Sequence, residues 1–444
     1  MSSLKHAVFA FSLFFCTGLF DPAKAFETYD ITLGHKPVIA SDTKGGMHII
    51  FTRRDYKSNT YDVDLYYSQS TNGSSIWTEP VKIAVAGELS ADFVRADLAV
   101  ESNGAIDVVW GEAMYGNIGY IFFARSTDNG HTWSKPLNIS QITQNSDDCN
   151  TPSLAIGPDN SIHVVWSYSN HPKCYFDEVA NELIMLEAHV NGIHSGFSSD
   201  GGKTWHRNLP IKNDNAGPSK FDDPDIAVTP DGTVHVVWHH VIYSESSKIY
   251  YAQKTTDGWT EPAIVSERMI SKPLICVGGR EKVYVTSYTG DRNPYLVCAF
   301  KEKSEPFSTP INICHGRDIT ELAAASDQSG QMAIVWFGGI RDPVDYWNYN
   351  FSARIMDTNT NKRSKITNFG RKLSNYESVT AAICNNKVAI ICESDFGDGP
   401  LKLILLPLEE SAADRKVTLD QTFSGTVKSS SLLHSPLEVA ENIQ

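Results

Sequence analysis

An all-β fold is predicted by three observations on this chain of 444 residues. Pairs of short apolar runs, each pair joined by a tight turn, recur at a spacing of roughly 50–70 residues, which is typical of repeat folds. No helical periodicity separates the pairs. A polar turn with the pattern S-x-D-x-G-x-x-W occurs twice, at residues 126–133 and 198–205. Four antiparallel strands repeated in series indicate the blades of a β-propeller.

The first two strands of each unit are the clearest part of the repeat. An apolar run containing alanine is followed by a β-branched run that ends in tryptophan, as in residues 97–110, 153–166 and 225–238. The turns between them, such as Asn103-Gly104, are typical of hairpins. Weaker copies start at Pro37, Pro273, Leu322 and Val379. Seven units predict seven blades, and six remain open because a terminal unit could be degenerate.

The outer two strands of each unit are expected on either side of the S-x-D-x-G-x-x-W turn. Residues 29–33 have the pattern of an outer strand, but no unit precedes them. We expect them to complete the last blade and close the ring, with residues 416–419 as the alternative. The propeller is assigned to residues 26–425, and the Ser-rich residues 426–444 are expected to form a flexible C-terminal tail.

The two repeated turns have a simple physical interpretation. Their aspartates can accept hydrogen bonds from backbone N–H groups, their glycines supply a positive φ, and their tryptophans provide large apolar anchors. The residues concerned are Ser126, Asp128, Gly130, Trp133, Ser198, Asp200, Gly202 and Trp205. These turns resemble the Asp-box (BNR repeat) of the sialidase-like, or neuraminidase, superfamily of β-propellers. The resemblance implies a structural role on the face away from the ligand, and sialidases have six blades.

The N-terminus predicts export of the chain. In residues 1–25, Lys5 and His6 precede an apolar run, and Ala23 and Ala25 offer a cleavage site, so these residues are predicted to be a signal peptide. The mature protein is expected to be secreted or periplasmic, without a membrane span, because no other apolar stretch approaches the ~18–20 residues required. A net charge of −14 disfavours nucleic acid as a partner. We expect a monomer.

Cysteine spacing and loop length give a weaker prediction. The mature chain keeps seven cysteines without any C-x-x-C pair, so neither a zinc nor a redox motif is indicated. Cys149 and Cys174 flank or lie in an insertion of the third unit, and we expect a disulfide between them, with two separate thiols as the alternative. No cofactor and no metal site are expected. A Ca²⁺ site at Asp222, Asp223 and Asp225 is the alternative.

The ligand is expected at the end of the propeller where the inner strands begin. The aligned positions there are Lys36, Arg95, Thr151, Asp223, Lys272, Thr320 and Ser378. With Glu321, Tyr346 and Trp347 nearby, this rim combines both charges with aromatic rings and suits a polar ligand such as a sugar. Asp223, Glu321, Tyr346 and Trp347 are therefore predicted to bind a glycan or glycoprotein. The alternative is a rim of solvated loop ends.

The family resemblance also implies a catalytic arrangement. Sialidases hold a carboxylate with three arginines and use a tyrosine nucleophile activated by a glutamate, with an aspartate as acid/base. The candidates for this set are Arg95, Arg341, Arg371, Tyr376 and Glu377. The family's first arginine lies in an R-I-P motif, whereas this chain has Lys36 before Pro37. We therefore predict carbohydrate binding, with an exo-α-sialidase-type glycoside hydrolase and a protein-binding scaffold as alternatives.

Overall fold

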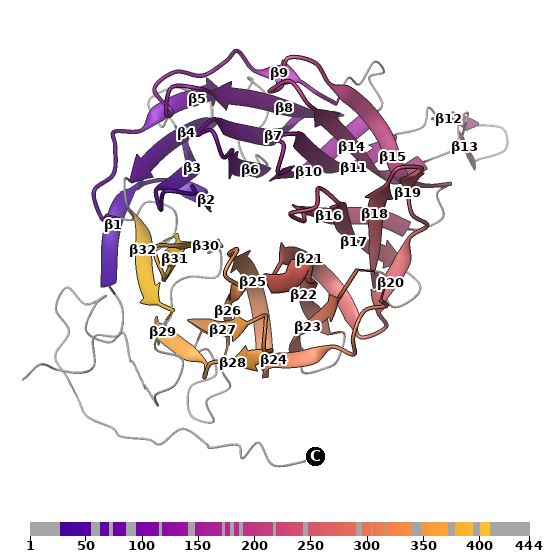
Figure 1. Ribbon diagram of the computed structural model, residues 1–444. Helices are drawn as coiled ribbons and strands as arrows, with labels where there is room; N and C mark the ends of the chain where they lie inside the picture. The colour runs from indigo at the N-terminus through magenta and orange to yellow at the C-terminus, as the bar shows by residue number, and fades with distance from the viewer. Residues whose placement is uncertain are drawn as a thin grey trace, which may run out of the picture.

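The chain forms a ring of seven blades around a central axis (Figure 1). The computed structural model describes residues 27–54, 63–70, 74–85, 95–114, 118–140, 147–170, 174–177, 182–185, 190–215, 219–242, 247–289, 295–303, 305–315, 317–339, 349–371, 378–393 and 400–408. Each blade is an antiparallel sheet of four strands with the first strand nearest the axis, and in blades 4 and 6 the outer position is divided between two short strands. The predicted all-β propeller with seven blades is confirmed, and a count of six is wrong for this chain.

The strands of the seven blades follow one another along the chain. Blades 1 and 2 contain β2 (His35–Ser41), β3 (Met47–Arg54), β4 (Val63–Ser70), β5 (Val81–Val85), β6 (Arg95–Val100), β7 (Ile106–Met114), β8 (Ile118–Ser126) and β9 (Leu137–Asn138). Blades 3 and 4 contain β10 (Asp147–Ile156), β11 (Ile162–Asn170), β14 (Val190–Ser198), β15 (His206–Asn215), β16 (Ser219–Val228), β17 (Val234–Ile242) and β18 (Lys248–Thr255), with β19 (Gly258–Trp259) and β20 (Ala263–Ser266) both pairing with β18.

Blades 5 and 6 contain β21 (Met269–Val277), β22 (Val283–Thr289), β23 (Tyr295–Lys301), β24 (Ile311–His315), β25 (Arg317–Ser326), β26 (Gln331–Gly339) and β27 (Tyr349–Asp357), with β28 (Lys362–Arg363) and β29 (Thr367–Arg371) both pairing with β27. A short 3-10 helix, η2 (Gly279–Glu281), joins β21 to β22. In the described part of the chain, no helix is long and apolar enough to cross a membrane.

The last blade is built from both ends of the described chain. It contains β30 (Val379–Cys384), β31 (Lys387–Cys392), β32 (Pro400–Pro407) and β1 (Glu27–Leu33). Strand β1 pairs antiparallel with β32, for example Tyr29 with Leu403. The expectation that residues 29–33 close the ring is therefore confirmed. The alternative segment, residues 416–419, lies outside the described residues.

The hydrophobic core lies between the blades. Successive side chains of each second strand point alternately toward the two neighbouring blades and so fill both interfaces. Val108 packs with blade 1 and Val109 with blade 3, because neighbouring residues of a strand point to opposite faces. The tryptophans that end these runs, Trp110, Trp166 and Trp238, are at most 1% exposed. Because both faces of these second strands are buried, their sequences are continuous β-branched runs, and such runs predicted the strands.

The two turns that resemble the Asp-box have the same geometry. The Asp128 carboxylate accepts a hydrogen bond from the backbone N–H of Thr132 at 2.9 Å, and Ser126 Oγ accepts one from Gly130 at 2.9 Å. The distances around Asp200 and Ser198 are also 2.9 Å, and Gly130 and Gly202 have φ of 80° and 79°. Hydrogen bonds from Thr132 lower the pKa of Asp128 to about 2.

These turns fasten neighbouring blades together. Trp133 makes an edge contact with Tyr67 of blade 1 at 5.3 Å, and Trp205 makes one with Phe123 of blade 2 at 5.0 Å. Trp133 lies ahead of the next strand, because β9 begins only at Leu137. The turns follow third strands, so they lie at the end of the ring opposite the starts of the inner strands.

Replacing Gly130 by Ala is expected to lower the free energy of unfolding by about 3 kcal/mol, through left-handed strain and overpacking. A Cβ at Gly130 would lie 2.0 Å from the Tyr67 ring. Gly104→Ala is the matched control, because Gly104 has φ of 89° and nothing within 4 Å of an added Cβ. The control should lose only about 1 kcal/mol. Equal losses for the two variants in urea unfolding would contradict this role for Gly130.

Candidate functional site

Four inner strands share an irregularity near their first residues. Lys36, Thr151, Asp223 and Lys272 have φ of 48°, 51°, 46° and 44°, and each of them precedes a proline. The pairing register shifts at the same place in β2, β10, β16 and β21, as expected for a bulge. Left-handed backbone is unfavourable for residues other than glycine, above all for β-branched Thr151. Strained bulges of this kind re-aim side chains and are found at functional sites.

Four charged side chains from four blades lie together at this end of the axis. The Arg95 guanidinium donates a hydrogen bond from Nη1 to Asp223 Oδ1 at 2.8 Å, across the start of blade 3. Lys272 Nζ lies 3.6 Å from Glu321 Oε1. Burial raises the pKa of Glu321, while nearby Lys272 and Arg95 lower it and Asp223 raises it further. We refer to Arg95, Asp223, Lys272 and Glu321 as the charged cluster.

Two polar side chains near the charged cluster have atoms without a partner. Tyr288 is the residue before the last of β22 and is only 7% exposed, and its hydroxyl has no hydrogen-bond partner among the described residues. Burial raises its pKa, and so does the nearby Glu321 carboxyl. The Nε2 atom of His239 is likewise buried and unpartnered in the part of the chain that the structure describes. Burial lowers the pKa of His239, although Asp223 and Asp222 lie close enough to oppose this.

Such atoms are informative because burying a polar group without a partner costs about 1–3 kcal/mol. Native structures satisfy nearly all of their buried polar groups with protein, water or ligand. Tyr288 and His239 belong to blades 5 and 4, which also supply Lys272 and Asp223 to the charged cluster. This end of the ring therefore offers unsatisfied donors and acceptors beside two ion pairs.

The other acidic side chains of this region, Asp222 and Asp225, bind to different partners. Asp222 pairs with Lys220 at 2.6 Å, and Asp225 accepts hydrogen bonds from Ser153 and from the backbone of Ile275, each at 2.8 Å. Asp222, Asp223 and Asp225 thus face different partners, and no group of three or more metal-ligating side chains is found among the described residues. The alternative of a Ca²⁺ site at these aspartates has no support in this geometry.

Deeper along the axis, buried carboxyls join the inner strands of neighbouring blades. Asp97 accepts a hydrogen bond from the backbone of Leu154 at 2.7 Å, and Ser153 Oγ lies 3.2 Å from the same carboxyl oxygen. Burial raises the pKa of Asp97 to about 7. These contacts connect blades 2, 3, 4 and 5 just below the charged cluster, so they hold its supporting strands in place.

A second polar group lies where blades 7 and 1 meet. Glu393 accepts hydrogen bonds from His35 at 2.8 Å, from the backbone of Lys36 at 3.2 Å and from Ser378 at 3.0 Å. Neither Glu393 nor Tyr288 was predicted from the sequence. Both stand at or just after the end of a second strand, β31 and β22, and that position was the available signal.

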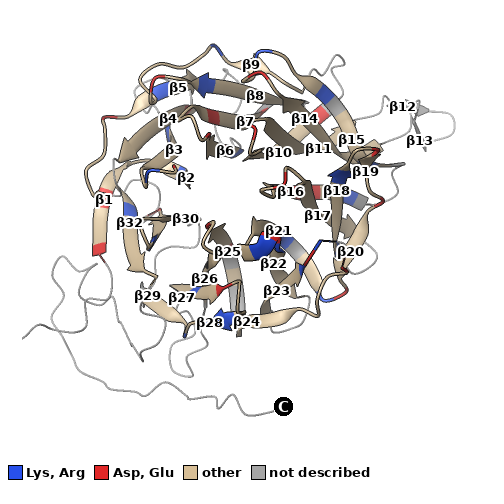
Figure 2. Ribbon diagram, in the orientation of Figure 1, with Lys and Arg blue, Asp and Glu red and all other residues tan. Residues whose placement is uncertain are grey.

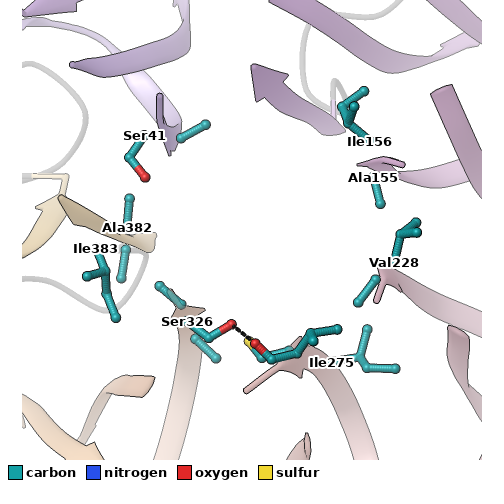
Figure 3. Close-up of a pocket in the computed structure, with 15 residues that line it drawn as sticks. Ser41, Ala155, Ile156, Val228, Ile275, Ser326, Ala382 and Ile383 are labelled. Carbon is teal, nitrogen blue, oxygen red and sulfur yellow. Dashed lines mark hydrogen bonds between the residues drawn. The ribbon is translucent and has the colours of Figure 1, made fainter. Parts of the chain in front are cut away.

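The opposite end of the axis is lined mainly by apolar side chains. A cavity of about 370 Å³ is lined there by small and apolar residues from six inner strands, among them Ala155, Val228, Ile275 and Ala382 (Figure 3). Ser326 lies on this rim but donates its hydroxyl proton to the carbonyl oxygen of Val277 at 2.7 Å. All lining residues are Ala, Ser, Val, Ile or Cys, so this cavity offers few polar groups to a ligand, in contrast to the charged cluster.

The structure tests only part of the predicted site. It brings Arg95, Asp223 and Glu321 together, as expected for residues at the starts of inner strands. Arg371 ends β29 at the outer edge of blade 6, and its side chain is not described. The other candidates lie outside the described residues: Arg341, Tyr346, Trp347, Tyr376 and Glu377. The three-arginine site with its Tyr–Glu pair stays a prediction.

The predicted disulfide also stays a prediction. Cys149 is buried on β10. Cys174 begins β12 (Cys174–Asp177), which pairs with β13 (Glu182–Met185) in a hairpin within the insertion of blade 3, and its side chain is not described.

Comparison with known proteins shows similarity of fold. No family model matches the chain, and no curated protein does. The BP39L lectin from Burkholderia pseudomallei has a TM-score of 0.57 at 12% identity, over 86% of this chain and 97% of the lectin. Polysaccharide lyase Uly1 has a TM-score of 0.52 at 8% identity, over 84% and 90%. The Hadza microbial sialidase Hz136 has a TM-score of 0.48 at 13% identity, over 79% and 74%.

Proposed function

We propose that this chain is an exported propeller that binds a glycan at the charged cluster. The observation that carries the proposal is the convergence of Arg95, Asp223, Lys272 and Glu321 beside the unpartnered Tyr288 hydroxyl. Sugar hydroxyls both donate and accept hydrogen bonds, so a sugar needs acceptors and donors at short range. Carboxylates supply the acceptors, and guanidinium and ammonium groups supply the donors.

We infer binding rather than hydrolysis from the state of Arg95. A sialidase-type site would use this guanidinium to hold the carboxylate of the substrate, because its fork matches a carboxylate. Here Arg95 already donates to Asp223. A carbohydrate ligand is compatible with the similarity of fold to a lectin and a polysaccharide lyase, which are 12% and 8% identical to this chain.

The test is a glycan array with the purified mature protein, followed by titration of the best ligand. Lys272→Ala is expected to weaken binding at least about tenfold, since a charge-assisted hydrogen bond contributes roughly 1.5–3 kcal/mol. Lys303→Ala is the matched control: Lys303 also has a positive φ, 40°, and lies 3.8 Å from Glu281 near the turns of the opposite end. If no glycan binds, or if both variants weaken binding equally, the proposal fails.

A further inference from the structure

Three ion pairs lie at the ligand end of the axis. Arg95 pairs with Asp223, Lys272 with Glu321 and Lys220 with Asp222. The charged cluster therefore has two positive and two negative members. In Figure 2, both basic and acidic residues are scattered over the described strands of the ring.

We propose that the site takes a neutral saccharide, recognised through its hydroxyl groups, and discriminates against acidic ones. This inference rests on the proposed function and names the ligand class of the same site. It differs from what the family resemblance implies, because sialidase substrates carry a carboxylate.

An acidic ligand would meet a built-in competitor. A carboxylate or sulfate group that approached the Arg95 guanidinium would find its positive charge already paired with Asp223, which is only 24% exposed, and would lie beside that second anion. Asp223 has little freedom to withdraw, since its own N–H donates to Asp222 at 3.0 Å and its backbone is fixed in the bulge. On the other side of the cluster, Glu321 adds a further acidic group.

A neutral sugar avoids this conflict. One hydroxyl can donate to a carboxylate oxygen while its neighbour accepts from the guanidinium, so both ion pairs remain in place. The Arg95 side chain is 63% exposed and uses one N–H group for Asp223, so it has further donors for a sugar hydroxyl. The Tyr288 hydroxyl and His239 Nε2 add one group each that can bond to a neutral hydroxyl.

The experiment compares neutral saccharides with their acidic counterparts by titration calorimetry on the full mature chain. The probes are oligogalactan against oligogalacturonan, cello-oligosaccharides against their glucuronate-ended forms, and lactose against sialyllactose. We expect at least one neutral member to bind, with its acidic counterpart at least about tenfold weaker. Tighter binding of an acidic member by the wild-type chain overturns this inference and leaves glycan binding intact. Absence of binding to every saccharide overturns both proposals.

The Asp223→Asn variant tests the mechanism of discrimination. The amide keeps the shape of the side chain but releases Arg95 from its ion pair, so the variant should lose affinity for the neutral ligand and gain affinity for the acidic one. Glu281→Gln, which removes a carboxylate from the Lys303 pair at the opposite end, should leave both affinities unchanged. A thermal melt of each variant establishes that it is folded. An Asp223→Asn protein that keeps the wild-type ratio of affinities contradicts the proposed role of Asp223.

Discussion

An Arg125→Met variant is expected to lose about 3–5 kcal/mol of its free energy of unfolding, the usual cost of breaking a buried ion pair on one side. Arg125 lies on β8 and faces two carboxyls. Its Nη2 lies 2.8 Å from Glu101 Oε2 and its Nη1 lies 3.0 Å from Asp107 Oδ1. Glu101 and Asp107 are 2% and 0% exposed.

The next blade helps to bury this group. Gly201 stands in the repeated turn of blade 3, and a Cβ added to it would lie 3.3 Å from the centre of the Arg125 guanidinium. The turn that joins blades through Trp205 and Phe123 thus also covers the ion pair of blade 2. Water has little access to the carboxylates that would remain after Arg125 is removed.

The two carboxyls that face Arg125 differ in how readily they ionise. Burial opposes ionisation of Glu101, but hydrogen bonds from Arg125, Asp107 and Asn103 outweigh it and lower the pKa of Glu101. Burial raises the pKa of Asp107 well above its usual range. Glu101 is therefore the partner of Arg125 that ionises more readily, and burial opposes ionisation more strongly at Asp107.

Asp107→Asn is accordingly the control, because the amide oxygen can still accept from Arg125 and the change leaves the Arg125–Glu101 pair in place. We expect it to cost only about 1 kcal/mol, as for a single altered hydrogen bond. Both variants can be measured by urea unfolding near neutral pH. Similar losses for Arg125→Met and Asp107→Asn would show that the group is not organised around one charge.

The repeats could be predicted from the sequence because their signals are local. The β-branched runs ending in Trp110, Trp166 and Trp238 need only strand periodicity, and the turns at Asp128 and Asp200 need only hydrogen bonding within a few residues. Closure by residues 29–33 followed from a strand pattern without a partner. The repeat pattern also shows where each inner strand begins, and these starts were therefore expected to lie together at the ligand end.

The contacts within the site could not be predicted in this way. Arg95 and Asp223 are 128 residues apart in sequence, and they meet only because the blades curve around the axis and a bulge turns Asp223 toward blade 2. One signal was overlooked: a proline follows the bulged residue in four inner strands, at Pro37, Pro152, Pro224 and Pro273. No sequence pattern indicated that the Tyr288 hydroxyl would be buried without a partner.

Acid is expected to destabilise the propeller by several kcal/mol between about pH 6.5 and pH 4. Burial lowers the pKa of His163, His194 and His235 to about 4 each. Lys254 adds to the effect at His163, and Lys301 adds to it at His235. Neutral rings suit their contacts, such as His235 Nδ1 with the Tyr251 hydroxyl at 2.7 Å and His194 Nε2 with Asn213 at 2.9 Å.

The sign follows from proton binding. Between about pH 6.5 and pH 4 the unfolded chain protonates these histidines and the folded chain does not, so the free energy of unfolding falls as the pH falls. Each shift from about 6.5 to about 4 corresponds to at most ~3 kcal/mol. Asp97 acts in the opposite direction, because its raised pKa of about 7 makes the folded state bind a proton more tightly than the unfolded state. Asp107, Asp225 and Glu321 also have raised pKa values and oppose the loss, whereas the lowered pKa values of His48 and His239 add to it. The net loss is therefore smaller than the sum of the histidine contributions.

Two variants distinguish the contributions of the histidines and of Asp97, because they should change the slope of the free energy of unfolding against pH in opposite directions. His235→Gln removes one proton-binding group of the unfolded state, so the acid-induced loss of stability should become smaller. Asp97→Asn removes the opposing contribution, so the loss between about pH 7 and pH 4 should become steeper, while Asn can still accept a hydrogen bond from Leu154. Urea unfolding of both variants and the wild type across this range measures the slopes directly. An unchanged slope for His235→Gln would mean that this imidazole is accessible to protons in the folded chain, and that the Tyr251 contact does not keep it neutral.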